Sequence, residues 1–72
     1  MSTPIRVAYA DVDRGEVEDT YRLSPKGQLY CNGIPSSLLR ENLTDDELWE
    51  YVHDHLSSLP PAYGITNIRR IA

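Results

Sequence analysis

Two histidines and one cysteine are the side chains of this sequence best suited to metal or nucleophilic chemistry. His53 and His55 stand two residues apart, a spacing that on a strand would place both imidazoles on one face and suit a transition metal. Their segment reads as a helix, where residues two apart point about 200° away from each other. We therefore expect no shared metal ion.

Cys31 could act as a nucleophile only with a base beside it, because the thiolate is the reactive form. Neither histidine is expected to face the sheet that carries Cys31, and no glycine-rich oxyanion motif flanks it. The sequence also lacks a phosphate-binding loop, a dinucleotide fingerprint and a nucleophile elbow. We expect a buried structural cysteine, no catalytic residue, no cofactor and no enzyme.

All eleven carboxylates of the chain fall in two clusters. The first surrounds a predicted hairpin turn and consists of Asp11, Asp13, Glu16, Glu18 and Asp19. The second has no basic residue within it and consists of Glu41, Asp45, Asp46, Glu47, Glu50 and Asp54. Acidity segregated in this way can form a cation site, a surface for a basic partner, or a solvated face.

A cation site is the weakest of these alternatives. Asp11, Asp13 and Gly15 resemble the start of a calcium loop, but such a loop needs Asp or Asn at its fifth position, Gly at its sixth and Glu at its twelfth. Those positions hold Gly15, Glu16 and Arg22. We assign no metal ligand, and a loose divalent-cation site on Asp11, Asp13 and Glu16 is only our third hypothesis.

The second cluster lies on the most strongly specified element, a helix that follows Thr44. Thr44 and Glu47 have the spacing of a capping box, in which each side chain binds the other's backbone amide. Pro60 and Pro61 end the helix. An apolar stripe about 100° wide predicts packing on a sheet; it consists of Leu48, Trp49, Val52, Leu56 and Leu59. Trp49 is expected mainly to anchor the core.

Alternating apolar and polar residues predict strands over 5–12, 17–23, 28–31 and 65–71. The isoleucines of the last segment recur every third residue, which a bulge or an edge position would reconcile. The stretch 35–41 is expected to form a short helical turn, because Pro35 suits a helix start.

These elements predict an α+β fold in which a four-stranded mixed sheet, in the order β-β-β-α-β, packs one amphipathic helix on one face. The last strand should pair with the first and run parallel to it through a right-handed crossover. The other sheet face would then stay open, carrying Arg6, Ala8, Thr20 and Arg22.

Composition limits the remaining possibilities. A chain of 72 residues with 40% hydrophobic and 25% charged residues should form a single domain over 1–72. Its net charge of −4 disfavours direct binding to nucleic acid or to an anionic membrane. One cysteine cannot form an internal disulfide, and neither a membrane span nor a signal peptide at residues 1–4 is evident, so we expect a cytoplasmic protein.

The outer face of the helix suggests a function, because Asp46, Glu50 and Asp54 form a row of like charge that a basic partner would relieve. Our leading hypothesis is a small acidic regulatory module that binds a protein partner, with or without forming a homodimer, through this face or the open sheet. The second is an inhibitor or regulator of a nucleic-acid-binding protein, of the kind that phages encode. The candidate partner-binding residues are Asp46, Glu47, Glu50 and Asp54 on the helix and Asp11, Asp13, Glu16 and Glu18 at the hairpin.

Overall fold

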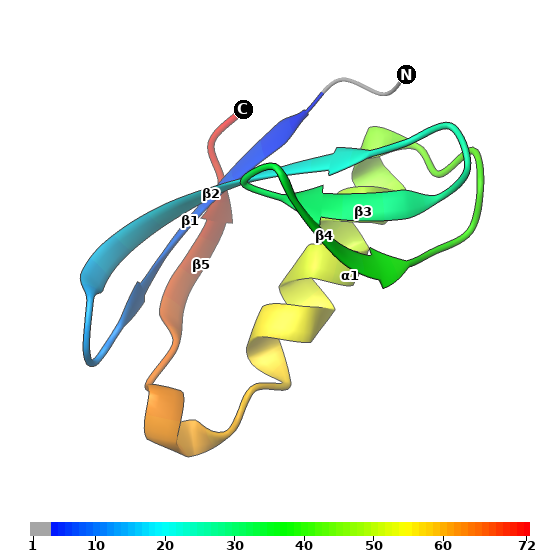
Figure 1. Ribbon diagram of the computed structural model, residues 1–72. Coiled ribbons are helices and arrows are strands. Elements are labelled where there is room, and N and C mark those ends of the chain that lie inside the picture. Colours follow the sequence, from blue (N-terminus) through cyan, green and yellow to red (C-terminus); the bar gives the residue numbers. More distant parts are fainter. Residues whose placement is uncertain (1–3) are drawn as a thin grey trace.

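The chain forms an antiparallel sheet with an α-helix on one face, which confirms the α+β class (Figure 1). The computed structural model describes residues 4–72; residues 1–3, where part of the expectation about a signal peptide falls, lie outside this range. The elements are β1 (Ile5–Asp11), β2 (Gly15–Leu23), β3 (Gln28–Cys31), β4 (Ile34–Leu38), α1 (Asp45–Ser57), the 3₁₀-helix η1 (Pro61–Tyr63) and β5 (Thr66–Arg70).

The sheet has five strands rather than the expected four, in the order β4-β3-β2-β1-β5. The additional strand is β4, which replaces the helical turn expected over 35–41. Asn32 and Gly33 cause this difference: their φ values of 53° and 82° form the two-residue reversal that suits a tight hairpin. Pro35 is tolerated because β4 lies at the edge of the sheet, where a missing N–H breaks no ladder.

The expected parallel strand is also wrong, because β5 pairs with β1 in the antiparallel sense. The pairing partner itself was predicted correctly. One extra strand before α1 makes the chain enter the helix from the opposite end of the sheet, and this reverses the direction of the strand that follows. A register shift between Ala8 and Ala10, together with the positive φ of Asn67, forms the irregularity that the isoleucine spacing predicted.

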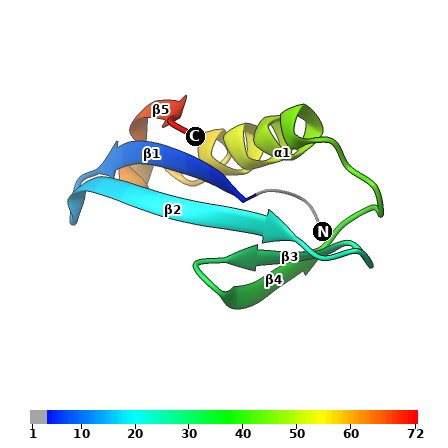
Figure 2. The ribbon, with the colours of Figure 1, turned by 90° about the horizontal axis from the view of Figure 1, so that it is seen from above.

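The core lies between α1 and the concave face of the sheet (Figure 2). Ile5, Val7 and Tyr9 of β1 alternate into it, as expected. The other strands and α1 contribute Tyr21, Leu23, Leu29, Leu48, Val52 and Leu56. Seen from above, α1 runs beside β1 and β5, and the β3–β4 hairpin lies on the far side of β2 (Figure 2). The sheet thus curls around the helix and leaves its convex face uncovered.

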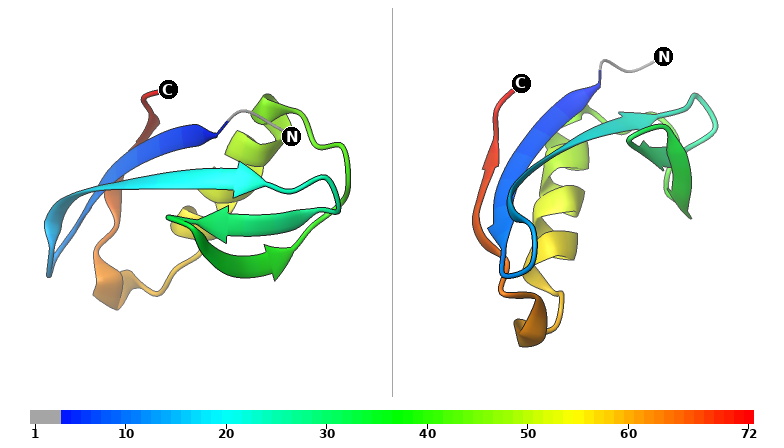
Figure 3. Two further views of the ribbon diagram at one scale, coloured as in Figure 1. Left: turned by 45° about the horizontal axis from the view of Figure 1, so that its top comes forward. Right: turned by 60° about the vertical axis from the view of Figure 1, so that its left-hand side comes forward.

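The start of α1 is the one predicted. Thr44 accepts a hydrogen bond from the Glu47 amide at 3.1 Å, and the Glu47 carboxylate accepts one from the Thr44 amide at 3.1 Å. After the helix, η1 brings the chain close to the tip of the β1–β2 hairpin (Figure 3), where the Val12 amide donates to the Tyr63 carbonyl at 3.2 Å. Between residues 4 and 72, no helix has the length and apolarity needed to cross a membrane.

Candidate functional site

At the turn of the first hairpin, the Asp11 carboxylate is already occupied by protein donors. Asp11 accepts hydrogen bonds from the amides of Asp13 and Arg14 at 2.9 and 2.6 Å, and from the Arg14 side chain at 2.7 Å. The backbone bond from Arg14, followed by its side-chain bond, lowers the pKa of Asp11 below its ordinary value. Asp13 is exposed beside this turn. The Asp11 carboxylate therefore acts as a turn-forming group.

On the convex face of the sheet, glutamate side chains form ion pairs with arginines of other strands. Glu18 pairs with Arg6 across β1 and β2, and Glu16 pairs with Arg69 of β5. Ala8, opposite Glu18, is only 3% exposed, and Thr20, opposite Arg6, is half-buried. The guanidinium of Arg22 completes the row, 4.6 Å from the ring centre of Tyr30. The open face is therefore neutralised along most of its length.

Asp19 belongs to the same acidic cluster in sequence but is buried in the fold, with 8% of its surface exposed. It accepts hydrogen bonds from the Tyr9 hydroxyl and the Asn32 side-chain amide, both at 2.8 Å. Asn32 in turn accepts from the Thr20 amide at 2.8 Å, so the group joins β1, β2 and the β3–β4 turn. Burial and the hydrogen bond to Asp19 raise the pKa of Tyr9.

The acidic row of α1 differs from the hairpin cluster because only its first member has a basic partner. Asp46 lies 3.4 Å from the guanidinium of Arg70. Glu47, beside the row, pairs with Arg40, and the Thr44 amide lowers its pKa. Among the residues that the structure describes, no cation pairs with the other two members of the row, Glu50 and Asp54, and both are exposed.

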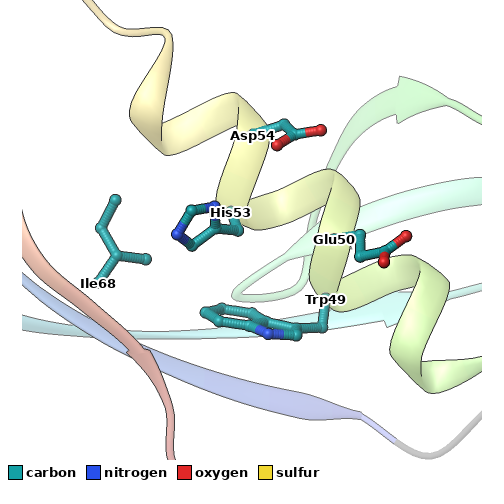
Figure 4. A pocket seen from close by; sticks show the side chains of 5 residues that line it. All are labelled: Trp49, Glu50, His53, Asp54 and Ile68. Atoms are coloured by element: carbon teal, nitrogen blue, oxygen red, sulfur yellow. The ribbon is translucent and has the colours of Figure 1, made fainter.

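A groove of about 590 Å³ lies between α1 and β5, next to these two carboxylates. Trp49 and His53 project from α1 toward Ile68 of β5 and form its apolar wall (Figure 4). Their rings meet edge to face, 5.5 Å apart at 72°. Glu50 and Asp54 also line the groove, and their carboxylates point away from Ile68, on the other side of the helix from Trp49 and His53 (Figure 4). The sequence did not reveal this groove, because its second wall is a strand expected in the opposite direction.

Trp49 contributes to the site more than the sequence indicated. It packs against the core but is only partly buried, and its indole lines the groove. The available signal was its position at the border of the apolar stripe, directly before Glu50.

Cys31 lies in a second, smaller cavity of about 80 Å³ between α1 and the β3–β4 hairpin. His55, an exposed residue of α1, also lines the cavity, stacked on Tyr51 with ring centres 6.2 Å apart. Cys31 is half-buried, and desolvation followed by the nearby charge of Asp19 raises the pKa of its thiol. A protonated thiol is a poor nucleophile, so the cavity does not activate it.

His53 and His55 diverge as the helix predicted, one packing on Trp49 and the other on Tyr51. Within residues 4–72, no three His, Cys, Asp or Glu side chains gather in an arrangement that could hold a metal ion. The exposed carboxylates without an ion-pair partner in the described part of the chain are Asp13 and Glu41, which stand apart from each other, and Glu50 and Asp54, which are neighbours on α1.

Comparison of the chain with protein-family models, with curated proteins and with solved structures finds no match.

Proposed function

We propose that this protein is a small, non-enzymatic binding module that recognises a basic segment of a protein partner through the outer face of α1. The observation that carries the proposal is the distribution of paired charge. Arginines pair with Glu16 and Glu18 on the convex sheet face and with Asp11 at the first hairpin, whereas Glu50 and Asp54, two neighbours in one row of α1, have no cationic partner among the described residues. These two carboxylates also border a groove with an aromatic wall.

The pairing pattern favours α1 over the other candidate surfaces. The eight candidate residues do not gather on one surface, because Glu16 and Glu18 lie on the sheet face that α1 leaves uncovered. The inhibitor hypothesis relied on both acidic clusters entering one basic groove, and it therefore receives less support. The cation-site hypothesis relied on Asp11, Asp13 and Glu16, and two of these three, Asp11 and Glu16, already bind an arginine.

The physical basis of binding is relief of repulsion together with contact to an aromatic surface. Like charges one helical turn apart destabilise a helix by a few tenths of a kcal/mol per pair, and a basic partner converts this cost into attraction. Trp49 offers a flat ring beside the carboxylates, where a cationic group and its apolar stem can both bind favourably.

The test compares capture of partners from cells that express the protein by three forms of the chain. The wild type should retain a partner that Glu50→Lys/Asp54→Lys loses. The control, Asp13→Lys/Glu41→Lys, makes the same change in net charge at exposed acids outside the groove and should retain it. The purified partner should then bind the wild type with an affinity that falls steeply as salt rises. Equal capture by all three forms would contradict the proposal.

A further inference from the structure

The chain itself shows how an arginine on an extended segment reaches the acidic row of α1. Arg70 extends from β5 to Asp46, the first member of the row, at 3.4 Å. Ile68, two residues earlier on the same strand, faces α1 one turn further along and lines the groove. Because Ile68 is apolar, β5 provides no second cation there. β5 therefore forms an ion pair with Asp46 but not with Glu50, the next member of the row.

The spacing of the row matches an extended chain. Residues four apart on a helix are separated by about 6 Å along its axis, and residues two apart on a strand by about 6.6 Å. Asp46, Glu50 and Asp54 follow each other at four-residue intervals. An extended segment beside α1 that carries a cation at every second residue therefore meets Glu50 and Asp54 in turn.

The groove wall suits the side chain of arginine in particular. Trp49 and His53 lie between Ile68 and the carboxylates of Glu50 and Asp54 (Figure 4), so an arginine that starts near β5 would extend across these two rings to reach the carboxylates. Its methylene stem can lie on the apolar wall, and its planar guanidinium can stack on the indole while it donates to a carboxylate. Lysine provides the charge but not the planar stacking.

β5 can also hold the backbone of such a segment. It is the terminal strand of the sheet next to the groove, and only β1 pairs with it among the described elements. The outer edge of a terminal strand presents backbone groups to which an extended peptide can add as a further strand. The neighbouring helix would then contact alternate side chains of the added strand.

We propose that the groove between α1 and β5 binds an extended segment of a protein partner with arginines at alternate positions, its backbone along β5 and its guanidinium groups on Glu50 and Asp54. The inference rests on the proposed function, because it specifies the conformation and the motif of the basic segment that α1 recognises.

Synthetic peptides test the motif, with the fluorescence of Trp49, the one tryptophan of the chain, as the signal. The probe is a short peptide of arginine alternating with threonine, free of tryptophan and tyrosine. It should bind at least about tenfold more tightly than an isomer of the same composition with its arginines adjacent. Glu50→Gln/Asp54→Asn should weaken binding of the probe by about tenfold, and the control Asp13→Asn/Glu41→Gln should leave it unchanged.

Backbone methylation tests the added strand. N-methylation of the probe amides on one edge should abolish binding because it blocks pairing with β5, and methylation of the opposite edge should leave binding intact. Equal affinity of the two isomers, tighter binding of a helical peptide with arginines four residues apart, or a dimer of this chain that buries the groove would each overturn the inference. Where a partner is captured through Glu50 and Asp54 but the peptides show no preference for alternation, the inference fails and the proposed function stands.

Discussion

At the scale of single residues, Asp19 shows that neighbours in the sequence can have unrelated roles. It stands next to Glu18 in the sequence. Glu18 lies on the convex face in an ion pair, whereas Asp19 is buried and accepts two hydrogen bonds. The alternation of a strand separates the two, because successive side chains point to opposite faces. The sequence predicted that alternation, but it could not show that the buried position holds a carboxylate with partners.

We predict that Asp19→Ala destabilises the fold by about 2 kcal/mol, because it leaves the buried Tyr9 hydroxyl without its acceptor and removes the hydrogen bond from the Asn32 amide. Urea unfolding measures the change. Asp13→Ala is the matched control, since Asp13 is exposed, and it should change stability by less than about 0.5 kcal/mol. Equal losses in the two variants would show that the network contributes nothing.

We predict that the Cys31 thiol of the folded protein reacts slowly with iodoacetamide near neutral pH, because burial holds its pKa above the ordinary value. Because folding raises the pKa of the Cys31 thiol, the protonated thiol is favoured in the folded protein. Its contribution to the stability of the fold is fully present below the unfolded pKa and is lost as pH rises through the folded pKa. Alkylation rates measured against pH, with the urea-unfolded chain as reference, test this. A folded protein that reacts as fast as the unfolded chain contradicts it.

At the scale of elements, the helix and the first strands were predictable and the β3–β4 hairpin was not. A capping box and an apolar stripe are local signals, so α1 starts where the sequence indicated. The Asn32-Gly33 pair was an equally local signal for a hairpin, but Pro35, two residues after it, suggested a helix start. The position of Pro35 on an edge strand resolves that conflict, and edge position depends on the whole sheet.

Gly27 and Gly33 have similar backbone conformations but differ in the space available for a side chain. Gly27 and Gly33 both have positive φ, at 88° and 82°. A Cβ at Gly33 would meet no atom within 4 Å, but one at Gly27 would lie 2.4 Å from the Leu39 carbonyl oxygen. We predict that Gly33→Ala costs about 1 kcal/mol from backbone strain alone and that Gly27→Ala costs clearly more. Thermal unfolding ranks the two variants, and a smaller loss at Gly27 would contradict the close approach.

The capping box predicts a specific response to acid. Hydrogen bonds from Thr44 lower the pKa of Glu47, and Arg14 lowers that of Asp11, so both carboxylates stabilise the fold above their unfolded pKa and stop doing so as pH falls through the folded pKa. Glu47→Gln preserves the capping geometry but cannot titrate. Its stability should fall less than that of the wild type between about pH 5 and 3, measured by urea unfolding at each pH. Glu41→Gln should follow the wild type.

At the scale of the whole molecule, the excess of acidic residues divides into a paired part and an unpaired part. Composition gave the net charge, and the order of residues gave the two clusters. Which carboxylates meet an arginine depends on contacts such as Glu16 with Arg69, far apart in the chain and brought together by the pairing of β5 with β1. The groove depends on the same pairing, so neither could be predicted without the correct topology.

The unpaired row predicts that stability and binding oppose each other. Glu50 has a like charge one turn before it and one turn after it, at Asp46 and Asp54. Glu50→Lys should therefore stabilise the protein by about 0.5 kcal/mol at low salt while it removes partner binding. The gain, measured by urea unfolding, should shrink at about 0.5 M salt. Asp13→Lys, outside the helix, should show no comparable gain, and a Glu50→Lys variant that is less stable than the wild type would contradict the repulsion.

The pairing of β5 with β1 also sets an order for folding. The β1–β2 and β3–β4 hairpins close short loops, but the β1–β5 ladder joins Ala8 to Arg69 and must close almost the whole described chain. Closing a longer loop costs more chain entropy, so this ladder should form last. Ile68 belongs to it, and the groove therefore takes shape only in that final step. If the groove binds a partner as we propose, a partially folded chain with the β1–β2 and β3–β4 hairpins in place would still be unable to bind, and recognition would require complete folding.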